Sequence, residues 1–70
     1  MSLLEAKLGQ EYIIGNIATE DAELDAFLFS LGCYAGEPIT VVARRRGSLV
    51  ISVKDGRYSI DGQRAEAIEI

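Results

Sequence analysis

The chain has 70 residues, of which 49% are hydrophobic, and its formal net charge is −4. A chain this short is expected to form a single domain over residues 1–70, and its apolar content excludes intrinsic disorder. The acidic balance argues against a nucleic-acid-binding protein, and no apolar run approaches the roughly 20 residues of a membrane span.

The first predicted strand covers residues 12–17 and follows a short segment that ends at Gly9. β-Branched and aromatic side chains dominate this stretch, as is typical of strands. Gly15 interrupts the alternation. Ile14 and Ile17 can share a face only if the strand bends or bulges at that glycine, as a small barrel requires in order to close.

An amphipathic helix is predicted next, with Thr19 or Glu20 as its N-terminal cap. Acidic residues in its first turn complement the helix dipole. Gly32 follows the last turn, where a left-handed C-terminal cap favours glycine. Apolar residues at i, i+3, i+4 and i+7 predict one core-facing stripe, made of Leu24, Phe27, Leu28 and Leu31.

Residues 39–60 predict a three-stranded antiparallel meander. In its first strand, alternation places Ile39, Val41 and Ala43 on one face. Asp55-Gly56 predicts a type I′ hairpin turn between the second and third strands, because that turn needs positive φ at both central positions.

The chain is predicted to finish with one helical turn over residues 62–66 and a strand over residues 67–70. The order is therefore strand, helix, three-stranded meander, helical turn, strand. About five short strands joined by tight turns indicate a mainly β fold, a small barrel with one inserted amphipathic helix.

The order and spacing of apolar residues and glycines carry a family resemblance. It rests on a helix-to-corner motif, a following hairpin and a terminal pattern of small and β-branched residues. The residues concerned are Leu4, Gly9, Ile14, Ile17, Leu28-x-x-Leu31-Gly32-Cys33-x-x-Gly36, Ile60 and Ala65-x-x-Ile68-x-Ile70. From Leu4 to Ile70 the chain resembles the ferrous iron transport protein A (FeoA) family. The resemblance implies a small, SH3-like, partly open barrel.

The same resemblance implies a small cytoplasmic accessory protein of ferrous iron uptake. Its expected partner is the cytosolic part of the FeoB-type GTP-binding permease, through which it would be peripheral to the membrane. The alternative is a stand-alone SH3-like regulatory domain that acts with an iron-dependent transcriptional repressor or another signalling partner. Two residues depart from the family pattern, Phe27 where the family usually has arginine and Ala35 where it usually has proline. An interaction that depends on that arginine therefore does not carry over.

The chain has little of the chemistry that catalysis or metal binding requires. It has no histidine and a single cysteine, Cys33, so it lacks an imidazole for proton transfer and cannot form an internal disulfide. We expect no enzymatic activity, no metal site and no cofactor, and we expect Cys33 to pack as a small hydrophobe. A domain this small needs further support, which indicates a partner or a homo-oligomer in a reducing, cytoplasmic setting.

Two features are candidates for partner binding. Phe29 lies off the apolar stripe and Tyr34 lies at the corner after the helix, so both aromatics are expected to be exposed, either as a binding surface or as cover for loops of the same domain. The basic run 44–46 either keeps a hairpin tip soluble or docks on an acidic partner or lipid head groups. The candidate residues are Phe29, Tyr34, Ala35, Arg44, Arg45 and Arg46.

Overall fold

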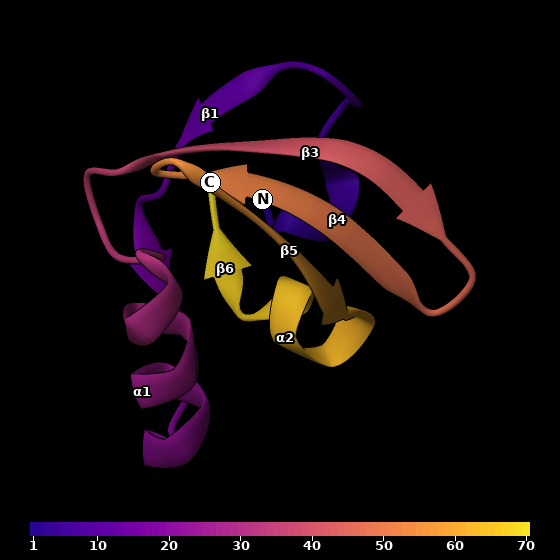
Figure 1. Cartoon of the computed structure of the whole chain (residues 1–70). Helices are drawn as coiled ribbons and strands as arrows, with labels where there is room; N and C mark the ends of the chain where they lie inside the picture. The colour runs from indigo at the N-terminus through magenta and orange to yellow at the C-terminus, as the bar shows by residue number, and fades with distance from the viewer.

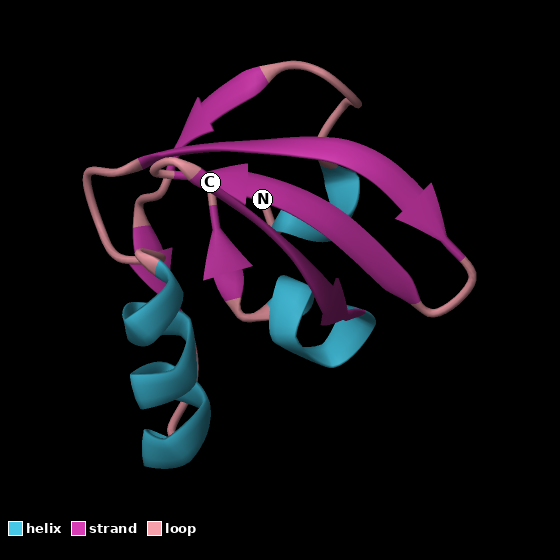
Figure 2. Ribbon diagram, viewed as in Figure 1, coloured by secondary structure: helices cyan, strands magenta, loops and turns pink.

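The computed structural model describes all residues, 1–70. Six antiparallel strands form a four-stranded sheet in the order β1-β3-β4-β5 and a two-stranded sheet of β2 and β6 (Figure 1, Figure 2). The two sheets do not close on each other, so the mainly β, partly open architecture is confirmed. The elements in chain order are η1 (Leu3–Glu5), β1 (Glu11–Ile13), β2 (Asn16–Ile17), α1 (Ala22–Leu31), β3 (Pro38–Arg45), β4 (Ser48–Val53), β5 (Gly56–Asp61), α2 (Gly62–Glu66) and β6 (Ile68–Glu69).

The first predicted strand is divided at Gly15, which raises the strand count from about five to six. β1 pairs with β3, whereas β2 pairs with β6 in the other sheet. Between them Ile14 is buried, and the N–H of Gly15 donates to the carbonyl of Glu69 at 2.8 Å. The bend expected at this glycine is therefore the point where the chain passes from one sheet to the other.

Helix α1 begins one residue after Asp21, which is its N-terminal cap. The Oδ1 atom of Asp21 accepts hydrogen bonds from two N–H groups of the first turn, at 2.9 and 3.2 Å. The prediction of Thr19 or Glu20 as the cap is therefore wrong. Thr19 instead accepts a hydrogen bond from the N–H of Asp21 at 3.1 Å. The predicted end is confirmed, since Gly32 caps the helix with a left-handed φ of 100°.

Helix α1 projects beyond the sheets, as Figure 1 shows. Leu28 is its only fully buried residue, while Leu24 and Leu31 are partly buried and pack against the core. Phe27 is 40% exposed, so its predicted place in the core stripe is wrong. At 100° per residue Phe27 lies on the flank of the stripe, and a helix that extends past the sheet leaves that flank uncovered.

A β-bulge in β3 changes which side chains face the core. Ile39 and Val41 are buried as predicted, but the register with β4 shifts between Val41 and Ala43. Beyond the shift Arg44 lies opposite the buried Leu49. Because opposed residues in an antiparallel pair share a face, Arg44 and not Ala43 shares the face of Leu49, although Arg44 itself is exposed. The prediction for Ala43 is wrong.

The β4–β5 hairpin is confirmed, but its predicted turn residues are wrong. Val53 pairs with Gly56, so the loop consists of Lys54 and Asp55 rather than Asp55-Gly56. Lys54 takes the positive φ of this turn, 54°. Gly56 has a different role, since the absence of a side chain there leaves room for the Tyr58 ring.

One hydrophobic cluster joins the two sheets and the helical segments. The predicted helical turn over residues 62–66 and the final strand are both present, and both contribute to this cluster. No helix has the length and the apolar character needed to cross a membrane. The buried side chains are those of Leu3, Ala6, Ile14, Leu28, Cys33, Ile39, Val41, Leu49, Ile51, Val53, Ile60, Ala65, Ala67 and Ile68.

Candidate functional site

The corner after helix α1 brings three of the predicted partner-binding residues together. The ring of Phe29, 64% exposed, lies with its centroid 4.9 Å from that of Tyr34, and the two planes are tilted by 34°. Tyr34 is half-buried and not exposed as predicted, because Lys54 lies against its ring, whereas Ala35 is exposed. These three residues are called the aromatic corner below. Its geometry is that of a tilted aromatic pair, which presents an apolar surface to solvent.

Lys54, from the β4–β5 turn, packs against the Tyr34 ring of the aromatic corner. Its Nζ lies 5.0 Å from the centroid of the Tyr34 ring and forms an ion pair with Glu37. Hydrogen bonding to Glu37, and secondly to Tyr34, raises the pKa of Lys54 above its usual range. The absence of a side chain at Gly32 leaves room for the Lys54 stem, because a Cβ there would lie 2.7 Å from Cγ of Lys54.

The basic run lies at the other end of β3 from the aromatic corner (Figure 1). The bulge places Arg44 on the same face of the sheet as Leu49, and its Nη2 donates a hydrogen bond to the carbonyl of Ala6, although Arg44 as a whole remains exposed. Arg45 and Arg46 are exposed at the tip of the β3–β4 hairpin and form no ion pair. The six predicted residues therefore form two separate groups, and one of the three arginines is held in an internal contact.

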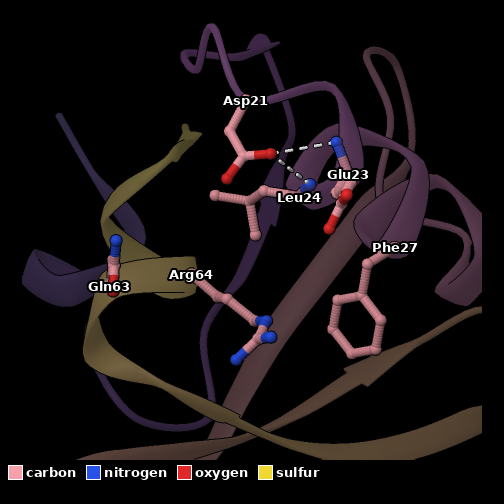
Figure 3. A pocket seen from close by; sticks show the side chains of 6 residues that line it. All are labelled: Asp21, Glu23, Leu24, Phe27, Gln63 and Arg64. Atoms are coloured by element: carbon pink, nitrogen blue, oxygen red, sulfur yellow. Dashed lines mark hydrogen bonds between the residues drawn. The ribbon is translucent and has the colours of Figure 1, made fainter.

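A cleft of about 330 Å³ between α1 and α2 was not predicted (Figure 3). The guanidinium of Arg64 lies 4.8 Å from the ring centroid of Phe27, and its Nη1 is 2.6 Å from Oδ2 of Asp61. The feature of the sequence that could have pointed to this cleft is Phe27, which stands where the family usually has arginine. In the structure its ring contacts Arg64. The cleft is lined by Asp21, Glu23, Leu24, Phe27, Gln63 and Arg64.

Cys33 is 1% exposed, and burial raises the pKa of its thiol to about 11. A protonated, inaccessible thiol is neither a good nucleophile nor a good metal ligand. The expectation that Cys33 packs as a small hydrophobe is therefore confirmed. No three acidic or cysteine side chains lie close enough together to hold a metal ion.

The sequence matches the FeoA domain family over residues 1–70. The chain belongs to the FeoA family. A comparison with curated protein sequences finds no match. Among solved structures, an iron uptake regulatory protein (FeoA) is 26% identical to this FeoA chain, with a TM-score of 0.86, and the match covers 97% of this chain and 91% of that one. The predicted family is thus confirmed.

Two further structures show the same fold. FeoA of Stenotrophomonas maltophilia, solved with zinc and described as a prokaryotic SH3 domain protein and a candidate ferrous iron transport activating factor, is 22% identical. Its TM-score is 0.86, and the match covers 99% of this chain and 87% of that one. A manganese-dependent transcriptional repressor is 20% identical with a TM-score of 0.88, over 97% of this FeoA chain, which spans only 39% of the repressor. The predicted SH3-like fold is thus confirmed.

Proposed function

We propose that this FeoA-family chain is a cytosolic accessory protein of ferrous iron transport that binds a FeoB-type permease through the aromatic corner. The single observation that carries the choice of surface is the exposure of Phe29, 64%, beside the ring of Tyr34. Membership of the FeoA family supports the link to ferrous iron transport. Binding, rather than chemistry, is the mode of action, since the chain offers no histidine and its one thiol is buried.

The aromatic corner has the physical properties of a binding hot spot. A large exposed ring supplies apolar contact area, and its neighbour already fixes its orientation, so little side-chain entropy remains to be lost on binding. Lys54 and Glu37 hold Tyr34 from the side of the sheet. The corner follows the C-terminal end of α1, where the chain turns back toward β3, and the exposed ring of Phe29 is accessible there without displacement of the core (Figure 1).

Arg45 and Arg46 form a second, electrostatic contact in this proposal. They are exposed and unpaired at the far end of β3, and they are available to an acidic surface of the same partner. Charges at the rim of an interface mainly change the association rate and its dependence on salt. Arg44 has no such role, because it is bound to Ala6.

The proposal is tested by titrating the purified chain against full-length permease in nanodiscs. We expect Phe29→Ala and Tyr34→Ala each to weaken binding by about tenfold or more, which is the size of a hot-spot contribution. Leu8→Ala is the matched control, because Leu8 is 56% exposed but lies outside the aromatic corner. Thermal unfolding of each variant separates loss of binding from loss of fold.

Two results would contradict the proposal. The first is no detectable binding of the wild-type chain to the intact permease. The second is a Phe29→Ala variant that is folded and binds as tightly as the wild type. Capture of a DNA-binding repressor in place of the permease would favour the alternative, a regulatory domain that acts in a transcriptional assembly.

A further inference from the structure

Strand β5 is an edge of the four-stranded sheet, paired with β4 on one side only. Successive residues of an antiparallel strand turn their N–H and C=O groups to opposite sides. The pair Val53–Gly56 closes the two-residue hairpin, so Gly56 faces β4, and every second residue after it does the same. Arg57 and Ser59 therefore direct their backbone groups toward the open edge. An open edge of this kind can accept another strand.

We propose that a second copy of this chain pairs with the β5 edge, antiparallel and with Ser59 of each copy at the twofold axis. This pairing joins two four-stranded sheets into one continuous sheet. A twofold contact of this kind is self-complementary, so each copy supplies the same residues to the other. The proposal uses neither Phe29 nor Tyr34, and it stands independently of permease binding.

Charge complementarity between the two β5 strands favours a second copy of this chain as the partner, and it favours this register. With Ser59 on the axis, Arg57 lies opposite Asp61 of the second copy, on the same outer face. Arg57 is exposed and forms no ion pair within its own chain. Moving the axis to Arg57 would place two guanidinium groups opposite each other, and like charges in that position destabilise a strand pair. The outer-face charges thus favour one register.

Asp61 can take part without leaving its place in the fold. Its Oδ1 accepts the N–H of Arg64 at 2.8 Å, and its Oδ2 accepts from Nη1 of the same arginine at 2.6 Å. A carboxylate has about four acceptor positions, so it can also receive a guanidinium from a second copy.

The inner face of the edge adds apolar contact. Tyr58, which is half-buried, would lie opposite Ile60 of the second copy, next to the core. Because β5 has only six residues, the interface is smaller than the about 1,200 Å² of a standard stable complex. We therefore expect a reversible dimer whose population rises with protein concentration.

Sedimentation equilibrium of the intact chain over a range of concentrations tests the proposal, combined with amide exchange measured by NMR. We expect a monomer–dimer equilibrium in which the amides of Arg57 and Ser59 become protected as concentration rises. Ser59→Lys places two ammonium groups at the axis and should weaken association by about tenfold or more. Thr40→Lys is the control, because Thr40 shares the outer face but lies on β3, between β1 and β4, and it should leave the dimer intact.

Arg57→Glu gives an independent test, because it places the new carboxylate opposite that of Asp61 in the second copy. This variant remains informative if Ser59→Lys does not fold. The proposal is overturned if the wild type stays monomeric at every concentration. It is also overturned if a folded Ser59→Lys or Arg57→Glu variant dimerises as well as the wild type. Protection that appears on α1 instead of β5 would overturn it too, because a different face would then associate.

Discussion

The guanidinium of Arg64 in α2 lies over the ring of Phe27 in α1, 4.8 Å from its centroid (Figure 3). The contact spans the cleft and holds the flank of α1 that the sheets leave uncovered. It joins a helix with only one fully buried residue to an element that packs in the core.

A double-mutant cycle measures this contact. Phe27→Leu keeps an apolar side chain but removes the ring, and Arg64→Met keeps the stem but removes the charge. We expect a coupling free energy of about 0.5–1 kcal/mol in urea unfolding, the usual size for a partly exposed cation–π pair. Additive effects of the two substitutions would show that the ring and the guanidinium do not interact in solution.

Gly32 and Gly36 allow backbone strain to be separated from a steric contact. Both have left-handed φ values, 100° and 92°, so alanine at either position should cost about 1 kcal/mol or more. Only at Gly32 does the new Cβ meet another side chain, 2.7 Å from Cγ of Lys54. We therefore expect thermal unfolding to show the larger loss for Gly32→Ala, and equal losses would argue against a role for Lys54.

Asp21→Ala tests the observed helix cap. The substitution removes the acceptor for two N–H groups of the first turn and should cost about 1 kcal/mol. Because α1 projects from the body, the loss should appear mainly as faster amide exchange within the helix. Thr19→Ala is the control and should cost less, since Thr19 accepts only from the N–H of Asp21. A larger effect at Thr19 would restore it as the cap.

The buried thiol of Cys33 predicts a loss of stability at alkaline pH. Its pKa is raised from 9.0 to about 11 by burial, so the unfolded chain loses this proton at a lower pH than the folded chain does. The stabilising contribution is complete below pH 9 and is lost as the pH rises through 11. Cys33→Ala, expected to cost about 1 kcal/mol at neutral pH, should lack this part of the pH dependence. Parallel unfolding curves for the two proteins from pH 9 to pH 11 would contradict the prediction.

Local patterns in the sequence were enough to predict the helix, the hairpins and the end of α1 at Gly32. Each depends on neighbouring residues, through periodicity or through a cap. Phe27 shows where such patterns fail, because a helical wheel gives the direction of the apolar stripe but not how far the rest of the protein covers it. The bulge in β3 fails for a related reason. The alternation of Ile39, Val41 and Ala43 is unbroken in the sequence, and only pairing with β4 reveals the extra residue.

The aromatic corner was predictable in part. Phe29 was expected to be exposed because it lies off the stripe, and the structure agrees. Lys54 gave no signal, because it meets Tyr34 and Glu37 only when the β4–β5 turn folds back against the corner. The basic run was predicted as a second candidate feature, and the length of β3 places it at the opposite end from the aromatics.

The bulge in β3 also determines on which face of the sheet each arginine of the basic run lies. The unmatched residue Val42 reverses the alternation of the residues that follow it. Arg44 therefore lies on the face of Leu49 and joins the N-terminal turn to the sheet through the carbonyl of Ala6, while Arg45 lies on the opposite face. If the strand kept Val42 but ran without the bulge, Val42 would pair with Val50 and Ala43 with Leu49, so that Arg45 and not Arg44 would share the face of Leu49. The three arginines thus differ in their surroundings because of one backbone irregularity that lies outside the triplet.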